Sequence, residues 1–517
     1  MPTSRSTIDA SACYRALCAH DARFDGRFFT AVTSTGIYCR PVCRVRTPRL
    51  ENCRFFEHAA QAEQAGYRPC LRCRPELAPL ERHWSSEDAG GILIQQAIQW
   101  LNDPQSWIDA EESGKAIARL AGRMGVSDRH LRRLFDTHLG ISPLQYLLTR
   151  KLLTAKQLLT DTGLPVGQVA LASGFSSQRR FNAAFLGHYR LSPSQMRQPP
   201  SVARGTGKPG HKPVMLAWRP PLDALALMGF FALRQIGGLE RVDLEGDPIL
   251  RRTLQVQAAG RTHTGWFSVR LLEQEHRASL AVSDGLLPVL PTIVARVRTM
   301  LDLNADPVAI NKTLNATFPQ GDGLRVPGCM DGFELAVRAI LGQQISVHAA
   351  RTLAQRLVTQ LGAPIETPHP ELCRLFPTPA ALANATPDTL GAMGIVKQRQ
   401  IALQALACAV MDGAVDLGPH ADPPSTIQKL QNLPGIGPWT AQYIAMRALH
   451  WPDAWPVGDV ALTKALGIPN HRSQEAHREA ESRSQVWRPW RSYAVIRAWS
   501  SSQTPTAVPH QPSEAHR

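Results

Sequence analysis

The chain has 517 residues and carries 57 Lys or Arg against 42 Asp or Glu, which gives a formal net charge of +15 at pH 7. This balance favours a polyanionic partner such as nucleic acid, while the 44% hydrophobic content excludes a disordered chain and the length allows several domains. No apolar run is long enough to span a bilayer and no signal-peptide segment follows the polar start. We therefore expect a cytoplasmic protein of bacterial type, associated with the nucleoid and without a membrane partner.

Two close cysteine pairs stand within the first 80 residues, spaced C-x3-C and C-x2-C. In a chain without a secretion signal, cysteines are metal ligands or thiols more often than disulfides. Zinc takes four ligands in a tetrahedron, and two pairs on separate turns provide them. We therefore predict one Zn²⁺ bound by Cys39, Cys43, Cys70 and Cys73. A purely structural role for this zinc is the alternative.

The same segment is crowded with arginines. Guanidinium groups bind phosphates through paired hydrogen bonds, so this density is typical of a surface that contacts the DNA backbone. We expect three of these side chains to contact DNA, namely Arg40, Arg44 and Arg72. Cys53, which has no paired partner in the sequence, is interpreted as a small buried residue.

Two helix–turn–helix segments are predicted further along, at 116–135 and 166–185. Each has a turn glycine, Gly125 or Gly174, followed by a helix rich in the Arg, Gln and Asn side chains that read base edges in the major groove. The DNA contacts expected from these helices are Arg129, Arg132, Arg133, Arg179 and Arg180. The alternative is a helical bundle whose arginines are solvated.

The composition changes after the second of these segments. Residues 198–213 are rich in Gly, Pro and basic residues, which predicts a flexible linker. Strand-like stretches at 252–259 and 266–272 then precede a helical run at 290–301, so this part is predicted to be a mixed α/β domain.

The C-terminal half contains a helix–hairpin–helix signature in LQNLPGIGPWTAQYIA, at residues 430–445. Backbone N–H groups in a turn around Gly435 and Gly437 can bind a DNA phosphate without reading sequence. Asp459 follows 22 positions after Gly437. The bland interpretation of Asp459 is a helix N-cap before ALTKAL, which does not exclude a catalytic role.

The first half resembles the Ada family of adaptive-response proteins. The strings TSTGIYCRPVCRVRTPRLENCRFF and AGYRPCLRCRPE resemble its zinc domain, and GISPLQY and RLSPSQMR resemble the ends of its AraC-type tandem helix–turn–helix. The resemblance implies that Cys39 accepts a methyl group from a DNA phosphotriester. Methylation of one of four zinc-bound thiolates changes the net charge from −2 to −1, which should tighten binding to promoter DNA. It also implies activation of transcription, with RNA polymerase as a partner.

The second half resembles AlkA-type 3-methyladenine DNA glycosylases of the helix–hairpin–helix superfamily. The resemblance rests on AWRPPLDALALMGFFALR, LRVPGCMDGFELAVRAILGQQISV and WRPWRSYAVIRAW. It implies a catalytic role for Asp459, a wedge residue at Gln344 that fills the gap left by a flipped base, and an aromatic base pocket. The pocket residues carried over are Phe230, Trp439, Tyr443 and Trp499. Trp439 stands where related bifunctional enzymes have a Schiff-base lysine, which predicts a monofunctional hydrolase.

We therefore expect an α+β multidomain chain, monomeric, that binds alkylated and promoter double-stranded DNA. The predicted parts are a zinc-bound α/β domain (1–80), an AraC-type double helix–turn–helix (90–197), a linker (198–213), a mixed α/β AlkA-type N-terminal domain (214–322), an all-α helix–hairpin–helix glycosylase domain (323–500) and a disordered tail (501–517). Its expected activity is removal of bases of the 3-methyladenine and 7-methylguanine class. The alternatives are a regulator with an inactive glycosylase-like half, or a glycosylase with a structural zinc only.

Overall fold

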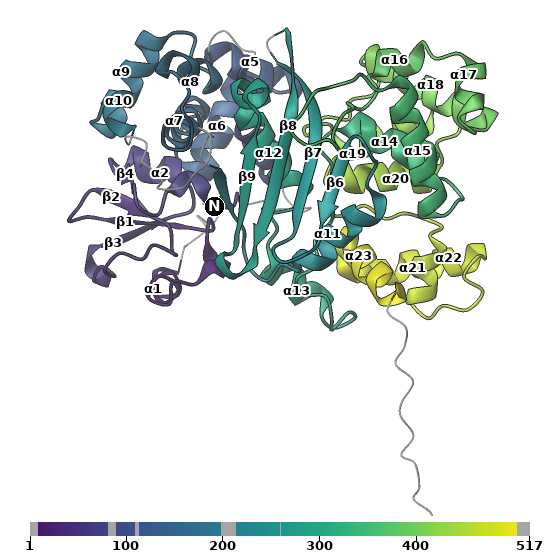
Figure 1. Ribbon diagram of the computed structural model, residues 1–517. Coiled ribbons are helices and arrows are strands. Elements are labelled where there is room, and N and C mark those ends of the chain that lie inside the picture. The colour runs from purple at the N-terminus through teal and green to yellow at the C-terminus, as the bar shows by residue number, and fades with distance from the viewer. Residues whose placement is uncertain (1–8, 81–88, 109–112, 198–212, 259, 504–517) are drawn as a thin grey trace, which may run out of the picture.

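A computed structural model describes residues 9–80, 89–108, 113–197, 213–258 and 260–503 (Figure 1). It confirms the predicted α+β multidomain fold class, with two separate sheets and extensive helical regions. Most of the predicted linker and of the predicted C-terminal tail lies outside the described residues. None of the described helices is both long enough and apolar enough to cross a membrane.

The N-terminal part is built on a four-stranded sheet with the order β3-β1-β2-β4. Strands β1, β2 and β3 pair antiparallel, whereas β4 joins β2 in parallel. A small apolar core that includes Phe29, Tyr38 and Tyr67 lies on this sheet. The elements are α1 (Ala10–Cys18), β1 (Phe29–Val32), β2 (Ile37–Cys39), β3 (Cys53–Phe56), α2 (Ala59–Gln64) and β4 (Arg68–Pro69).

The next part is helical and contains the two predicted helix–turn–helix units. Gly125 and Gly174 both have positive φ, the backbone conformation that these turns require. The long helix α7 contacts helices of both units and is the scaffold between them. The elements are α3 (Ala89–Asn102), α4 (Pro104–Ile108), α5 (Ser113–Arg123), α6 (Asp128–Leu139), α7 (Pro143–Asp161), α8 (Val166–Ala172), α9 (Gln178–Tyr189) and α10 (Pro193–Met196).

A five-stranded antiparallel sheet stands in the middle of the molecule, with the order β5-β9-β8-β7-β6 (Figure 1). Alternating burial along β8 and along the second half of β7 directs one face of the sheet into a core shared with α12. The elements are β5 (Val214–Ala217), α11 (Ala224–Arg234), β6 (Glu240–Asp243), β7 (Ile249–Ala258), β8 (Arg261–Leu272), β9 (Arg277–Val282), α12 (Leu290–Met300) and α13 (Pro307–Leu314).

The C-terminal part is all helical and has two apolar cores. Tyr443 and Trp451 border both of them. The elements are α14 (Gly332–Leu341), α15 (Val347–Leu361), α16 (Pro379–Ala383), α17 (Pro387–Ala392), α18 (Lys397–Met411), α19 (Pro423–Gln431), α20 (Pro438–Arg447), α21 (Val460–Ala465), α22 (Gln474–Arg483) and α23 (Arg491–Gln503).

Buried arginines join the N-terminal part to the central sheet domain. Asp25 is 2% exposed; its carboxylate pairs with Arg40 and its backbone carbonyl accepts a hydrogen bond from Arg219 Nε at 2.8 Å. Arg298 of α12 donates to the Leu77 carbonyl at 2.8 Å. Because these buried guanidinium groups donate to carbonyls across the junction, separating the two parts would break those hydrogen bonds.

The buried Asp25–Arg40 pair, which lies in the N-terminal part beside this junction, predicts a large effect on stability. Asp25→Asn leaves the Arg40 charge buried without compensation, so we expect a loss of about 3–5 kcal/mol in the free energy of unfolding of the N-terminal part. The matched control is Asp21→Asn, since Asp21 pairs with Arg23 at the surface and its loss should cost less than about 1 kcal/mol. Urea-induced release of zinc from the full chain measures both; equal costs would contradict the assignment.

Candidate functional site

The four predicted zinc ligands come together in the N-terminal part. The sulfur atoms of Cys39, Cys43, Cys70 and Cys73 all lie within 4.8 Å of one another. Tetrahedral zinc with Zn–S bonds of about 2.3 Å separates sulfurs by about 3.8 Å, so this spacing fits the ion. Cys39 ends β2 and Cys70 directly follows β4, so two of the ligands stand at neighbouring ends of a parallel strand pair.

The crowding of the sulfurs has an electrostatic consequence. The hydrogen bond with Cys43 raises the pKa of Cys39 well above its usual range, whereas the hydrogen bond with Cys39 lowers that of Cys70. Sulfurs this close cannot all be thiolates unless a cation balances them. The donor set, thiolate sulfur throughout, is the one that a structural or reactive Zn²⁺ site uses.

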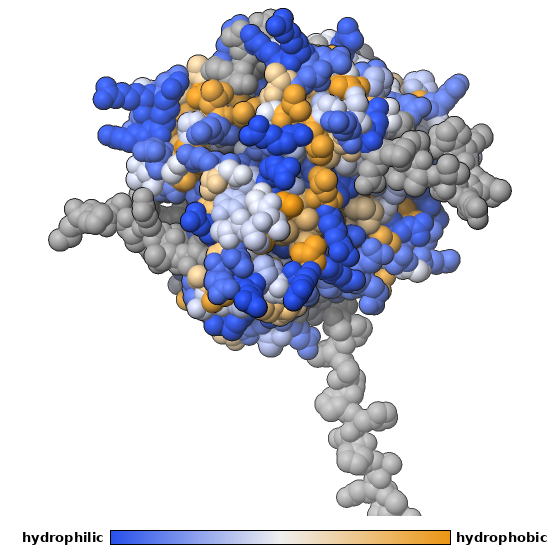
Figure 2. Space-filling model, turned by 90° about the vertical axis from the view of Figure 1, so that its left-hand side faces the viewer, coloured by the Kyte–Doolittle hydropathy of each residue, from blue (hydrophilic) through white to orange (hydrophobic). Residues whose placement is uncertain are grey.

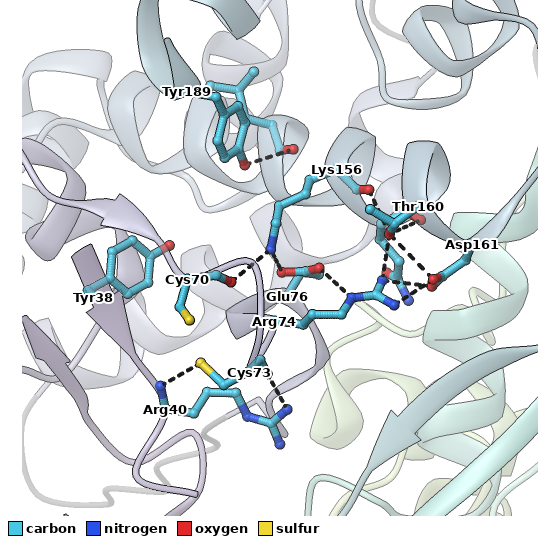
Figure 3. Close-up of polar contacts among 12 residues, drawn as sticks. Tyr38, Arg40, Cys70, Cys73, Arg74, Glu76, Lys156, Thr160, Asp161 and Tyr189 are labelled. Atoms are coloured by element: carbon cyan, nitrogen blue, oxygen red, sulfur yellow. Dashed lines mark hydrogen bonds and ion pairs between the residues drawn. The ribbon is translucent and has the colours of Figure 1, made fainter. Parts of the chain in front are cut away.

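The prediction that Arg40 contacts DNA is wrong, because its side chain is only 4% exposed and pairs with Asp25. Its guanidinium also donates to the Cys73 carbonyl at 3.0 Å, and its backbone N–H donates to Cys73 Sγ at 3.3 Å (Figure 3). Arg40 therefore stabilises, from the interior, the loop that carries Cys70 and Cys73, which we call the ligand loop. Cys53 also differs from its interpretation, since it is partly exposed and donates to the Arg49 carbonyl.

The other arginines of this part divide into two groups. Arg44 and Arg72 are exposed beside the cysteine cluster, so they remain available to a phosphate. Arg74, by contrast, binds Glu76 and Asp161. The face of the molecule that this half presents is largely hydrophilic (Figure 2).

The second helices of the two helix–turn–helix units expose their arginines. Ser127 accepts from the His130 N–H and Ser177 from the Arg180 N–H, so both helices begin with the same N-cap. Their opposite faces are buried, through residues such as Leu131 on α6 and Phe181 on α9. The exposed side chains are Arg129, Arg132, Arg133, Arg179 and Arg180.

A cavity of about 1210 Å³ opens between α11, α14, α20, α21 and α23. The four aromatic residues predicted for a base pocket all line it. Trp439 and Tyr443 are stacked, with centroids 5.1 Å apart and planes 11° apart, and the Trp499 ring lies 6.3 Å from Tyr443. The rings thus form a continuous wall of the cavity.

Asp459 lies in this cavity and is 8% exposed. One carboxylate oxygen accepts from the Trp439 indole at 2.9 Å, and the other from the Trp499 indole at 3.4 Å and from the Leu462 N–H at 2.8 Å. Asp459 is therefore the N-cap of α21, as the structural alternative predicts. Its carboxylate is also held by the indoles of Trp439 and Trp499. These three hydrogen bonds hold the carboxylate in a fixed orientation.

Two arginines of the cavity were missed by the sequence analysis. The Arg234 and Arg447 guanidinium carbons lie 3.6 and 4.7 Å from the centroid of the Phe230 ring, so this ring is already in contact with cations of the protein itself. Arg447 also donates to the Tyr443 hydroxyl at 2.6 Å. Burial opposes the shift, but Arg447 and Arg234 hold the pKa of Tyr443 below its usual value. Their i+4 spacing from Phe230 and Tyr443 was the available signal.

The hairpin and the predicted wedge residue border the same cavity. Gly435 has positive φ, and a Cβ there would lie 2.9 Å from Ala402, so glycine is required. Gln344 is exposed in the loop between α14 and α15, with φ of 54°. Its neighbour Gln343 donates to the Gly435 carbonyl at 2.8 Å, which ties this loop to the hairpin. Gly437, the last hairpin residue, is exposed and starts α20 as its N-cap.

Four family models match successive parts of the chain. The metal-binding domain of Ada matches residues 12–76, and a helix–turn–helix domain matches 120–199. The AlkA N-terminal domain matches 213–331, and the HhH-GPD superfamily of base excision DNA repair proteins matches 337–491. These matches confirm both resemblances drawn from the sequence and, with the sulfur geometry, the predicted four-cysteine zinc site.

Three relatives give the extent of the similarity. The probable bifunctional transcriptional activator/DNA repair enzyme AlkA of Mycobacterium tuberculosis is 36% identical over 96% of this chain and 97% of its own. DNA-3-methyladenine glycosylase 2 of Escherichia coli is 34% identical over 55% of this chain and 95% of its own. The bifunctional transcriptional activator/DNA repair enzyme Ada of Escherichia coli is 35% identical over 25% of this chain and 33% of its own.

The sulfur geometry predicts the metal content of the purified chain. The wild type should contain about one zinc ion per chain, and Cys43→Ser should lose it, because removal of one thiolate opens the tetrahedron. Cys18→Ser is the control, since Cys18 is an exposed thiol outside the cluster. Elemental analysis decides; full zinc occupancy in Cys43→Ser would contradict the ligand assignment.

Proposed function

Because the chain belongs to the family of bifunctional transcriptional activators and DNA repair enzymes related to AlkA and Ada, we propose that it removes alkylated bases and senses methylated DNA phosphates. The C-terminal half is a DNA glycosylase domain, and the N-terminal half carries the DNA-binding and zinc domains. The observation that carries the first activity is the placement of Asp459 against the aromatic cavity.

The proposed reaction is hydrolysis of the bond between C1′ of the sugar and the purine nitrogen. An N-alkylated purine is cationic, so it leaves with the bonding electrons as a neutral base. Positive charge then develops on the sugar, where the Asp459 carboxylate stabilises it. Water adds to C1′ and loses its proton towards Asp459 or solvent, which completes the exchange.

The aromatic wall is proposed to receive the flipped base. Electron-rich ring faces attract a cationic purine, and the stacked pair of Trp439 and Tyr443 with Trp499 provides such faces. Phe230 contributes shape more than cation binding, because Arg234 and Arg447 already contact its ring.

The DNA itself is proposed to be held at the rim of this cavity. N–H groups of the turn around Gly435 and Gly437 bind a backbone phosphate, and Gln344 fills the gap left by the base. The strained φ of Gln344 and the tie between Gln343 and the hairpin support a fixed wedge loop.

The glycosylase is proposed to be monofunctional. A lyase reaction needs an amine that forms a Schiff base with C1′. Among the described residues that line the cavity there is no lysine, and Trp439 occupies the position after the hairpin.

The second proposed activity is irreversible methyl transfer to Cys39. The Cys39 sulfur attacks the methyl carbon of a phosphotriester, the S–C bond forms, the C–O bond breaks and the phosphodiester leaves as an anion. A zinc ion held by the four cysteines would keep their sulfurs ionised at neutral pH. Of the other ligands, Cys73 accepts a hydrogen bond from the Arg40 N–H, which reduces its nucleophilicity. Exposed Arg44 and Arg72 are proposed to hold the flanking phosphates.

Loss of one negative charge should tighten binding of the helix–turn–helix units to promoter DNA. We propose that the chain then activates transcription as a monomer that contacts RNA polymerase, associated with the nucleoid. An inactive glycosylase half is the second candidate function, but the oriented carboxylate in an open cavity favours activity. A purely structural zinc is the third.

Asp459→Asn tests the glycosylase assignment. Asn still caps α21, so the fold should persist, while release of 3-methyladenine from methylated DNA should fall by at least about a hundredfold because the charge is lost. Base release is measured by chromatography of the free base.

The matched control for this variant is Asp422→Asn, which makes the same change at the N-cap of α19. It should release the base at the wild-type rate. Undiminished release by Asp459→Asn would remove Asp459 from the mechanism.

Mass spectrometry tests the methyl acceptor. After incubation with DNA containing methyl phosphotriesters, we expect one added methyl group on the peptide that contains Cys39, and none in a Cys39→Ala variant. A label on Cys43, Cys70 or Cys73 in the wild type would reject the assignment, and no label at all would favour a structural zinc.

A further inference from the structure

The two proposed recognition helices end at equivalent positions of the repeat. Helix α6 ends at Leu139 and α9 at Tyr189, and each is followed by a residue with positive φ and then by a Ser-Pro pair that starts the next helix. The last carbonyls of any helix lack partners within the helix and carry partial negative charge. Both ends therefore need donors from elsewhere.

The zinc domain provides a donor to each of these ends. Gln61 of α2 donates from Nε2 to the Leu139 carbonyl at 3.0 Å, and Arg68 of β4 donates to the Tyr189 carbonyl at 3.4 Å. A cationic guanidinium at the C-terminal end of α9 also interacts favourably with the helix dipole. We call these two contacts the carbonyl clamp.

Further contacts surround the carbonyl clamp. Glu63 of α2 accepts from Thr149 of α7 at 2.5 Å and lies 3.3 Å from His188 of α9. Ala60, also on α2, is 4% exposed and belongs to the apolar core of the first helix–turn–helix unit. Helix α2 of the zinc domain is thus packed into the tandem unit rather than beside it.

The zinc ligands are connected to the same region. Lys156 of α7 is 1% exposed and donates to the carbonyl of the ligand Cys70 at 3.3 Å and to Glu76 at 2.5 Å (Figure 3). Arg74, next to the ligand Cys73, reaches Asp161 at the end of α7. Arg68 itself stands two residues before Cys70. The ligand loop, α7 and the end of α9 therefore form one connected set of contacts.

We propose that the zinc domain positions both recognition helices for DNA, with Gln61 and Arg68 as the positioning residues of the carbonyl clamp. The spacing of α6 and α9 on the DNA then depends on the zinc domain as well as on α7. Zinc is consequently needed for sequence reading, apart from any methyl transfer. The naming of α6 and α9 as recognition helices rests on the proposed function, whereas the clamp contacts do not.

Hydrogen–deuterium exchange on the full chain tests the clamp without DNA. Removal of zinc by chelation should accelerate exchange in peptides 134–141 and 184–191, which contain the ends of α6 and α9. Gln61→Glu keeps the acceptor that caps His58 but removes the donor, so it should accelerate only the first peptide, by about fivefold. Arg68→Met should accelerate only the second, and Arg68→Lys should restore it.

Gln145→Glu is the matched control, because Gln145 occupies the same capping-box position in α7 and gains the same charge without touching Leu139. It should leave peptide 134–141 at the wild-type rate. Two outcomes would overturn the clamp. One is an equal acceleration of peptide 134–141 by Gln61→Glu and Gln145→Glu. The other is unchanged exchange of peptides 134–141 and 184–191 after zinc removal, while residues 37–73 exchange faster.

A DNA readout separates positioning from general destabilisation. Duplexes selected from a random pool by the wild-type chain serve as the probe, and affinity is compared with that for unselected duplexes. For each clamp variant, the ratio of affinity for selected duplexes to affinity for unselected duplexes should fall at least about tenfold, while the affinity for unselected duplexes stays at the wild-type value. A parallel loss on both probes would reduce the contacts to a structural role. If the wild type enriches no sequence, the proposed DNA reading fails, and the exchange experiment still decides the clamp.

Discussion

Four sulfur atoms within 4.8 Å of one another can be thiolates together only around a dication, and the N-terminal half depends on this constraint. The core of the zinc domain is small, so apolar burial alone stabilises it weakly. A zinc ion bound by Cys39 and Cys70 would fix the ends of β2 and β4, and the residues that reach the neighbouring helices lie on β4 (Arg68) and on α2 (Gln61). A local electrostatic requirement thereby becomes a requirement for the arrangement of a whole DNA-binding unit.

Buried arginines stabilise the structure, whereas exposed arginines are available to DNA. At the junction of the N-terminal part with the central sheet, arginines are buried against Asp25 and backbone carbonyls, where they hold parts of the chain together. On α6 and α9 they are exposed and available to phosphates and bases. Asp459 is arranged differently, because its oxygens accept hydrogen bonds from the indoles of Trp439 and Trp499 and from the Leu462 N–H.

The base pocket shows which site residues could be predicted from the sequence. Its four aromatic residues and Asp459 were predicted from their family positions, and the structure brings all of them to one cavity. The contacts of Arg234 and Arg447 with Phe230 were not predicted, since i+4 spacing permits the Arg234 contact without requiring it and the Arg447 contact joins two separate helices. In the proposed function, the other three rings therefore bind the cationic base.

The sequence by itself determined the features that depend on local spacing: the cysteine pairs, the turn glycines, the N-cap position of Asp459 and the hairpin before it. These follow from backbone geometry over a few residues, whereas the order of domains rested on the resemblance to the two families. Tertiary structure alone decided which polar groups meet across long separations. Arg40 was expected at DNA but is buried against Asp25, and Arg68 reaches Tyr189 across 121 positions. Spacing carries no information about such partners, because packing between domains selects them.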